Sequence, residues 1–324
     1  MTLAVEAAPV GEQVAFVFPG QGSQYVGMGQ RLHDLSDAAR RVFQQADDIL
    51  GFHISRLCFH GPSEELGDTI NAQPAILAVS HATHAALQER WNATGVTPVP
   101  ICYAGHSMGE FSALVAAGTL DFGDALRLVR ERGRLMKEAG DVVPGGMAAV
   151  VGMDRDQLTA LCAAASAQGG IVVLANDNCP GQSVISGDVE TLLRAMRMAH
   201  DQGARMVRRL DISIASHSPL MFDASQQLGD AAEGLRFSEP LSPIVSNITG
   251  KFVTSVDDLR RNVGVHMVRP VQWTSSVLEM VDHGVGTFLE VGPGQVLGGL
   301  IRRVRREVKT LTAADYGVQI SNPR

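Results

Sequence analysis

The stretch Gly105-His106-Ser107-Met108-Gly109 constrains the fold of this chain more than any other part of the sequence. It follows a short apolar run at residues 101–104 and leads into residues 110–118, which are mostly small or apolar and end at a glycine. This pattern predicts a strand, a tight turn and a helix. Because two glycines let the backbone bend sharply, we expect the Ser107 hydroxyl to stand exposed above a sheet, where the free N–H groups of a helix N-terminus can stabilise an oxyanion.

A second apolar run, at residues 14–18, fits a buried parallel strand. It ends in the glycine-rich loop Pro19-Gly20-Gln21-Gly22-Ser23-Gln24. The loop lacks the Gly-Lys-Ser/Thr ending of a P-loop and does not fit G-x-G-x-x-G, so we reject nucleotide binding there. We expect instead that its backbone N–H groups face a site at the C-terminal edge of the sheet.

Further helices and strands continue the α/β pattern. Pro74 is expected to open a helix that runs to about residue 91, because proline is well tolerated at a first helical position. Asp121 is the expected N-cap of a helix over about residues 123–138. Strands are expected at residues 212–217, 244–247 and 287–291, and a last helix at residues 296–309.

The region between the helix that ends at about residue 138 and the strand that begins at residue 212 has a different pattern. Strands are expected at residues 147–151, 171–175, 183–186 and 205–210, and helices at residues 155–168 and 189–202. The resulting order, β-α-β-β-α-β, is ferredoxin-like. The predicted fold class is therefore α/β, with an α/β-hydrolase-like large domain (residues 1–140 and 208–324) and an inserted ferredoxin-like small domain (residues 141–207).

Composition argues against several classes of function. The formal net charge of −7 argues against nucleic-acid binding, and no apolar run is long enough to cross a bilayer. Residues 1–11 lack the basic flank and apolar segment of a signal peptide, so we interpret them as a loose tail. The four cysteines form no C-x-x-C pair, which favours reduced thiols, no zinc site and a cytoplasmic protein.

A nucleophilic serine needs a base, and the chain has ten histidines. We favour His217, because it ends the strand expected at residues 212–217, and catalytic groups gather at strand ends in α/β folds. Packing without a catalytic role is the alternative for this residue. His106 is adjacent to the serine and is expected to pack. His81 and His84 share a helix face but have no evident third ligand, so we expect no metal site.

No acid stands out as the third member of a catalytic triad. Asp211 is separated from His217 by a segment that would span roughly 20 Å in extended form. Asp177 and Asp188 fall in the inserted unit. A backbone carbonyl could therefore hold the base in place of an acid.

Arg132 falls on an otherwise apolar helix face. The residues that share this face are Ala125, Leu128, Val129 and Met136. An arginine buried there cannot be left unpaired. It could form a structural salt bridge to an internal acid, or it could bind a substrate carboxylate through two hydrogen bonds and so select a carboxylated acyl group.

Several motifs occur in a fixed order along the chain: Phe16-Val17-Phe18-Pro19-Gly20-Gln21-Gly22-Ser23-Gln24, Gly105-His106-Ser107-Met108-Gly109-Glu110, Arg130-Glu131-Arg132-Gly133, Ser216-His217-Ser218-Pro219, Pro270-Val271-Gln272-Trp273 and Val291-Gly292-Pro293-Gly294. Together they resemble the malonyl-CoA:acyl carrier protein transacylase family, the acyltransferases of fatty-acid and polyketide synthesis. The resemblance extends from about residue 13 to residue 306.

The resemblance implies an enzyme that moves a malonyl or related carboxyacyl group from coenzyme A to the phosphopantetheine thiol of an acyl carrier protein. The mechanism would be ping-pong through a serine acyl-enzyme. The implied partners are acyl-CoA and the carrier protein, with no nucleic acid and no membrane. Coenzyme A enters as a thioester substrate, and no cofactor is implied.

The resemblance also implies a role for each matched residue. Ser107 would be the acylated nucleophile, His217 its base and Arg132 the ligand of the malonyl carboxylate. The backbone N–H groups of Gln21 and Met108 would form the oxyanion hole. The backbone carbonyl of His266 would orient His217; glutamine or asparagine is more familiar at that position.

The tetrapeptide Ile214-Ala215-Ser216-His217 bears on the choice of acyl group. Modular synthases commonly carry His-Ala-Phe-His for malonyl and Tyr-Ala-Ser-His for methylmalonyl. Here Ser216 leaves space beside the acyl α-carbon, whereas Ile214 departs from the methylmalonyl pattern. A methyl-sized difference discriminates by only roughly 1–3 kcal/mol. Malonyl is our first choice, and a discrete trans-acting polyketide acyltransferase for methylmalonyl or a bulkier group is the alternative.

Two other classes of protein share part of this pattern. A serine thioesterase or hydrolase would release free acid without a carrier thiol, and a non-catalytic carrier-binding module would form no Ser107 adduct. Acyl carrier proteins are acidic, so basic runs are candidate docking sites. The two runs are Arg302, Arg303, Arg305, Arg306 and Lys309, and Arg205, Arg208 and Arg209.

Overall fold

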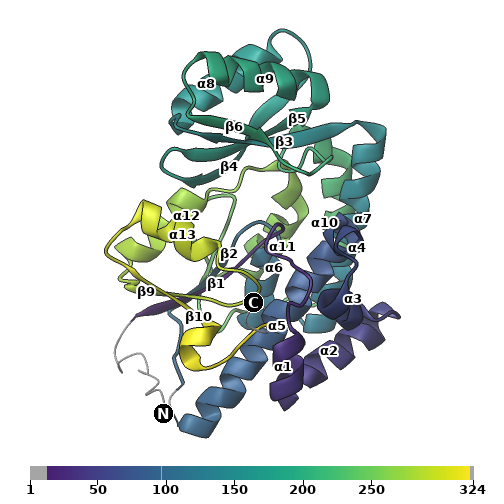
Figure 1. Ribbon diagram of the computed structural model, residues 1–324, viewed down its shortest axis with the longest axis vertical. Coiled ribbons are helices and arrows are strands. Elements are labelled where there is room, and N and C mark those ends of the chain that lie inside the picture. The colour runs from purple at the N-terminus through teal and green to yellow at the C-terminus, as the bar shows by residue number, and fades with distance from the viewer. Residues whose placement is uncertain (1–12, 96, 322–324) are drawn as a thin grey trace.

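The computed structural model describes residues 13–95 and 97–321, which form two packed domains (Figure 1). The larger domain contains a six-stranded sheet, and the smaller contains a four-stranded sheet. The tail predicted at residues 1–11 lies outside the described residues. Within the described part of the chain, no helix combines the length and apolar character needed to cross a membrane.

The large sheet has the strand order β10-β9-β1-β2-β7-β8. All neighbours pair in parallel except β8, which runs antiparallel to β7. Phe18 pairs with Gly105, so the loop after β1 and the turn after β2 leave the sheet side by side. The strands are β1 (Val14–Phe18), β2 (Cys102–Gly105), β7 (Ile244–Val245), β8 (Phe252–Val253), β9 (Thr287–Glu290) and β10 (Lys309–Thr312).

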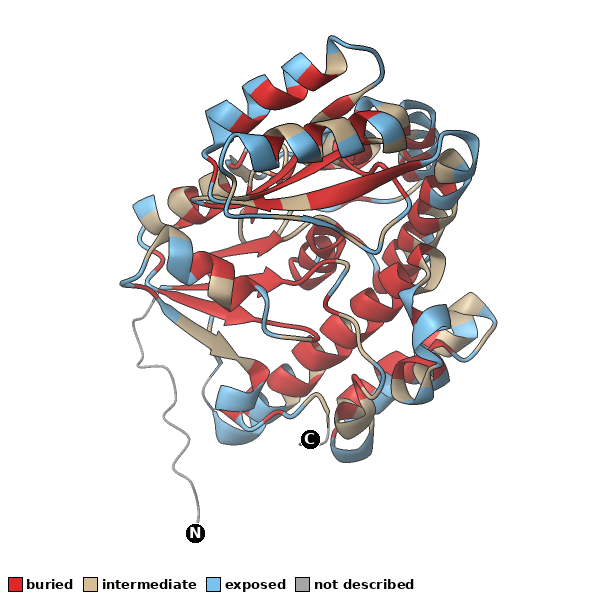
Figure 2. Ribbon diagram, turned by 45° about the horizontal axis from the view of Figure 1, so that its top comes forward, coloured by how far each residue is buried: buried red, intermediate tan, exposed pale blue. Residues whose placement is uncertain are grey.

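Both faces of the large sheet are covered, which is why the inner strands β1 and β7 are apolar throughout (Figure 2). Along β1, Ala15 and Val17 face one core, whereas Phe16 and Phe18 face the other. The first core includes residues of α12 (Trp273–Asp282) and α13 (Leu297–Val304). The second includes residues of α5 (Thr69–Thr94), α6 (Gly109–Ala116) and α7 (Phe122–Val142).

The remaining helices of the large domain surround this second core and the sheet edge. They are α1 (Gln30–Leu35), α2 (Asp37–Leu50), α3 (Ile54–His60), α4 (Ser63–Gly67), α10 (Phe222–Glu233) and α11 (Val256–Val265). The described ranges also contain three short 3₁₀ helices, η1 (Pro219–Met221), η2 (His266–Val268) and η3 (Ala313–Tyr316).

The small domain has the β-α-β-β-α-β order expected from the sequence. Its antiparallel sheet has the strand order β4-β5-β3-β6, as in ferredoxin-like folds, and α8 and α9 lie on its outer face (Figure 1). The elements are β3 (Gly145–Val151), α8 (Arg155–Ser166), β4 (Val172–Cys179), β5 (Gln182–Asp188), α9 (Val189–Asp201) and β6 (Met206–Arg209). The predicted fold class is confirmed.

The small domain is tied to the large one by backbone hydrogen bonds. Asp177 N donates to the carbonyl of Val271 at 2.9 Å, and Val271 N donates to the carbonyl of Ala175 at 2.8 Å. These bonds join β4 to the segment that precedes α12. They hold the inner face of the small sheet over the C-terminal edge of the large sheet, where Ser107 lies.

Pro74 does not open its helix, so that prediction is wrong. The helix α5 begins at Thr69, because the side chain of Asp68 accepts a hydrogen bond from Ile70 N at 3.1 Å and caps it. Pro74 therefore lies inside the helix, where it lacks the N–H that would bond to Ile70. Dense burial on all sides of α5 stabilises the helix in spite of this loss.

Two predictions for the C-terminal half of the chain, the strand at residues 212–217 and the full length of the helix at residues 296–309, are also wrong. Residues 212–217 are not a strand but an irregular segment, and His217 has a φ of 59°, which no strand residue adopts. The helix expected over residues 296–309 ends at Val304, and Lys309–Thr312 forms the edge strand β10. Thr310 and Thr312 are β-branched, which suits a strand better than a helix end. The Asp121 cap is as predicted, with its side chain accepting from Gly123 N and Asp124 N.

Candidate active site

The predicted nucleophile turn is present between β2 and α6. Ser107 has a φ of 50°, a left-handed conformation that non-glycine residues rarely adopt. The turn depends on both flanking glycines: a Cβ on Gly105 would come within 2.0 Å of the Gly109 backbone. A Cβ on Gly109 would come within 2.2 Å of the Phe18 carbonyl oxygen. The turn therefore holds Ser107 in a strained conformation of the kind found at functional sites.

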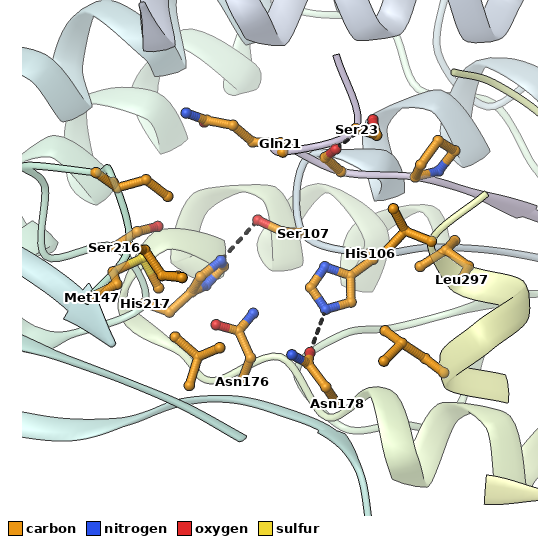
Figure 3. Close-up of a pocket in the computed structure, with 18 of the residues that line it drawn as sticks. Gln21, Ser23, His106, Ser107, Met147, Asn176, Asn178, Ser216, His217 and Leu297 are labelled. Carbon is orange, nitrogen blue, oxygen red and sulfur yellow. Dashed lines mark hydrogen bonds between the residues drawn. The ribbon is translucent and has the colours of Figure 1, made fainter. Parts of the chain in front are cut away.

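The structure places His217 beside Ser107, with 2.8 Å between His217 Nε2 and Ser107 Oγ (Figure 3). His217 Nδ1 lies 2.9 Å from the Arg269 carbonyl oxygen and 3.2 Å from that of His266. Carbonyls only accept, so Nδ1 carries the proton and Nε2 is free to take one from the serine. Burial, with a smaller contribution from Arg132, lowers the pKa of His217 to about 3, which keeps the imidazole neutral.

The Arg269 carbonyl was not foreseen from the sequence and is the nearer of the two acceptors. The His266 carbonyl is within reach, as the resemblance implied. Arg269 precedes Pro270, and a residue before proline is held in an extended conformation; Arg269 has φ −112° and ψ 145°. The Arg269-Pro270 dipeptide is the one signal in the sequence that indicates a fixed carbonyl at this position.

Arg132 is buried to 1% exposure beside the nucleophile. Its Nη1 donates to Gln73 Oε1 at 2.7 Å, and its Nη2 lies 3.5 Å from Ser107 Oγ. Nη2 also lies 3.4 Å from His266 Nδ1. No carboxylate among the described residues forms an ion pair with this guanidinium. The structural salt bridge, which was one of the two interpretations of Arg132, is therefore not formed among the described residues.

The charge of Arg132 is retained despite its burial. Desolvation lowers its pKa to about 10, and the nearby Glu110 carboxyl opposes that shift. The guanidinium is thus a cation at neutral pH, and its Nε has no partner in the described part of the chain. Gln73, which no pattern in the sequence marks out, accepts the hydrogen bond from Arg132 Nη1. A buried guanidinium beside a nucleophile, with no ion-pair partner among the described residues, is suited to bind a carboxylate.

The loop after β1 approaches the nucleophile turn closely. A Cβ on Gly20 would come within 2.3 Å of the His106 carbonyl oxygen, so only glycine permits this approach. The backbone N–H groups of Gln21 and Met108 donate to no acceptor among residues 13–95 and 97–321. Both donors are therefore available for an oxyanion beside Ser107, as the resemblance implied.

These groups meet in a cavity of about 240 Å³ between the two domains (Figure 3). Asn176 and Asn178 of β4 form part of its lining, and Asn178 Oδ1 lies 2.8 Å from His106 Nε2. His106 thus packs, as expected, and also joins the nucleophile turn to the small domain. Ser216 lines the cavity beside His217.

Ile214 does not line the cavity, contrary to the prediction that it contacts the substrate. It is buried and lines the adjoining groove of about 800 Å³ instead. Residues 212–217 form an irregular segment, in which Ser216 lines the cavity and Ile214 lines the groove. Ile212 faces both the cavity and the groove.

The histidine pair on α5 has a structural role. His81 stacks on Phe122 with ring centroids 4.4 Å apart, and His84 packs edge-on against Phe16. Burial lowers the pKa of each to about 4. No group of three metal-ligating side chains occurs in the described ranges.

A family model described as an acyl transferase domain matches residues 15–316. The chain belongs to the acyl transferase family. The sequence resemblance to malonyl transacylases is confirmed, because this acyl transferase is 41% identical over 303 residues to the malonyl CoA-acyl carrier protein transacylase of Bacillus subtilis, with 94% of each chain covered.

Other proteins similar to this acyl transferase are also named as malonyl transacylases. The malonyl CoA-acyl carrier protein transacylase of Escherichia coli K12 is 41% identical, with 93% of this chain and 95% of that one covered. The solved structure of the Coxiella burnetii transacylase matches with a TM-score of 0.90 at 36% identity, covering 95% and 97% of the two chains. A malonyl-transacylase solved in complex with its type II polyketide acyl-carrier protein also matches with a TM-score of 0.90, at 38% identity, covering 95% and 99%.

Proposed function

We propose that this acyl transferase moves a malonyl group from coenzyme A to the phosphopantetheine thiol of an acyl carrier protein, with Ser107 as the acylated residue. The observation that carries the proposal is the pairing of a Ser107–His217 contact of 2.8 Å with a buried guanidinium 3.5 Å from the same hydroxyl. The first provides a nucleophile, and the second provides a site for the free carboxylate of the acyl group. The relatives named as malonyl transacylases support the same assignment.

The first half-reaction loads the serine. Ser107 Oγ attacks the thioester carbonyl carbon while its proton passes to His217 Nε2. The developing oxyanion accepts hydrogen bonds from the N–H groups of Gln21 and Met108. The carbon–sulfur bond then breaks, and the leaving thiolate of coenzyme A takes the proton from His217. The product is a malonyl ester on Ser107 with a neutral histidine.

The second half-reaction reverses these steps with a different thiol. The carrier thiol gives its proton to His217 and attacks the ester carbonyl, and Ser107 leaves and recovers the proton. The proposed chemistry uses only side chains and backbone N–H groups, so we propose that no cofactor takes part. We also place the reaction in the cytoplasm, where thiols stay reduced; all four cysteines are free and buried.

Intact-mass spectrometry of the purified protein tests the proposal. Incubation with malonyl-CoA should give a stable malonyl adduct, which a holo-carrier protein then removes while gaining the same mass. Rapid release of free malonate without transfer would instead identify a thioesterase or hydrolase. A panel with acetyl-CoA and methylmalonyl-CoA addresses the space beside Ser216; faster loading of methylmalonyl than of malonyl would favour the trans-acting polyketide alternative.

The carrier is proposed to dock on the two basic runs, which follow residues of the cavity lining in sequence or precede them. Val296, Leu297 and Leu300 line the cavity, and the exposed Arg302 and Arg306 follow on the same segment. The second basic run ends next to Leu210, which also lines the cavity. Both runs are therefore close in sequence to residues that line the cavity, and we propose that an acidic carrier docks on them to present its thiol.

Charge reversal of both Arg302 and Arg306 to glutamate should raise the KM for the carrier roughly three- to tenfold and leave the KM for malonyl-CoA unchanged, because rim charges act mainly on association. Steady-state transfer assays at low salt measure both constants. Arg41→Glu, at an exposed arginine on α2 that lines no part of the cavity, is the matched control. A parallel rise in the KM for malonyl-CoA would assign these arginines to the coenzyme A phosphates.

A further inference from the structure

The side chain of Asn247 contacts the nucleophile turn at two peptide groups. Asn247 follows β7, the strand next to β2, and is 2% exposed. Its Oδ1 accepts a hydrogen bond from Ser107 N at 2.7 Å. Its Nδ2 donates to the Gly105 carbonyl oxygen at 2.5 Å. One amide therefore joins the residue before His106 to the residue after it.

The side-chain amide of Asn247 forms hydrogen bonds to the chain just beyond the point where backbone pairing between β2 and β7 ends. Along β2, Tyr103 pairs with Ile244 and Ala104 pairs with Val245. Beyond that point β2 turns sharply into the nucleophile turn, so no backbone of β7 can follow it. The Asn247 side chain supplies the acceptor and the donor that a neighbouring strand would have offered.

Asn247 is itself held by the helix that it supports. Its backbone N–H donates to Glu110 Oε2 at 2.9 Å, and its carbonyl accepts from Gln272 N at 2.7 Å. Glu110 lies in the first turn of α6, three residues after Ser107, and is 4% exposed. The nucleophile turn, the start of α6 and Asn247 thus form a closed ring of hydrogen bonds. Every polar group of Asn247 has a partner, so its side chain has one orientation.

The Ser107 conformation explains what this ring does. A left-handed φ of 50° is unfavourable for serine, and the short contact between Ser107 Oγ and His217 depends on it. The hydrogen bond from Asn247 satisfies the Ser107 N–H in that conformation. It also occupies this donor, which leaves the N–H groups of Met108 and Gln21 for the oxyanion. Asn247 does not line the cavity, so it does not touch the substrate.

We propose that Asn247 is a positioning residue for the nucleophile, which holds the Ser107 backbone in the conformation that aims its hydroxyl at His217. The inference rests on the proposed function, in which Ser107 is the acylated residue. It predicts that loss of the Asn247 side chain slows acylation without weakening substrate binding, because the groups that bind malonyl-CoA are not moved.

The test compares Asn247→Ala with Asn262→Ala. Asn262 is a neighbouring part-buried asparagine whose Nδ2 donates to Ser246 Oγ at 3.0 Å, and among the described residues no hydrogen bond joins its side chain to the nucleophile turn. Two rates are measured at saturating reagent: single-turnover acylation by malonyl-CoA, and labelling by a small fluorophosphonate, which reports nucleophile reactivity without a carboxylate. Asn247→Ala should slow both on the order of 10²-fold, as small misplacements of reacting groups do. The KM for malonyl-CoA should stay within about threefold, and Asn262→Ala should behave as wild type.

The isosteric Asn247→Asp guards against a folding defect in the alanine variant. It keeps an acceptor for the Ser107 N–H and loses the donor to Gly105, so its labelling rate should fall between those of wild type and Asn247→Ala. Wild-type rates in Asn247→Ala, or a rise in KM that matches the loss of rate, would overturn the inference. Failure of both variants to fold while Asn262→Ala folds would also overturn it, since Asn247 would then support the fold alone. An unlabelled wild-type protein would contradict the proposed function instead.

Discussion

Replacing Ser107 with alanine should abolish the covalent malonyl adduct and reduce transfer to the carrier by at least about 10³-fold, as the loss of a nucleophile does in related dyads and triads. His217 Nε2 contacts this hydroxyl at 2.8 Å, and the strained turn presents it to the cavity. Intact-mass spectrometry after incubation with malonyl-CoA measures the adduct. A carrier-acylation assay measures the residual transfer.

Binding should survive this substitution. The Ser107→Ala variant keeps Arg132 and the N–H groups of Gln21 and Met108, so its affinity for malonyl-CoA should be close to that of wild type. Ser276→Ala is a matched control, because this buried serine on α12 donates only to the Gln272 carbonyl and lies outside the cavity. A malonyl adduct of undiminished yield in Ser107→Ala would show that another residue carries the acyl group.

The nucleophile turn could be predicted because its causes lie within a few residues. Gly105 and Gly109 are required because a Cβ added at either position would come within 2.0 or 2.2 Å of neighbouring backbone atoms. An apolar strand before them and an apolar helix after them complete the local pattern. The same holds for Arg132, whose position on an apolar helix face required burial. The small domain was also predictable, since its strands and helices alternate with clear periods and short turns.

The errors have a different physical origin. At Pro74, the Asp68 cap and the packing of α5 within the core prevailed over the local preference of proline for a first turn. Residues 212–217 are apolar enough for a strand, yet His217 adopts a left-handed conformation next to η1. Ile214 was assigned to the substrate by comparison with the tetrapeptides of modular synthases, whereas in the structure it lines the adjoining groove.

The groups that hold the catalytic residues could not be predicted, because they come from distant parts of the sequence. Gln73 reaches Arg132 from α5, Arg269 reaches His217 from the segment after η2, and Asn247 reaches Ser107 from the end of β7. Apart from the proline that follows Arg269, no local pattern distinguishes these residues from other polar residues. Their roles follow only from the packing of three separate segments around one turn.

Replacing Arg132 with alanine should reduce loading from malonyl-CoA by roughly 100- to 1,000-fold, the range for removing one partner of a buried charge contact. Loading from acetyl-CoA should fall far less, because an acetyl group has no carboxylate for the guanidinium to bind. The variant also leaves Gln73 Oε1 without its partner, so some loss of stability is expected. Single-turnover loading with both thioesters, measured on folded protein, separates the two effects.

Arg134→Ala is the matched control, since this arginine lies on the same helix and pairs with Glu131 and Glu138 at the surface. It should load malonyl and acetyl groups as wild type does. Arg132→Lys keeps the charge but not the fork of two donors, and its preference for malonyl over acetyl should lie between those of wild type and Arg132→Ala. An equal loss of malonyl and acetyl loading in Arg132→Ala would mean that the guanidinium supports the site as a whole. Selective loss would identify Arg132 as the group that makes the enzyme choose a carboxylated acyl chain.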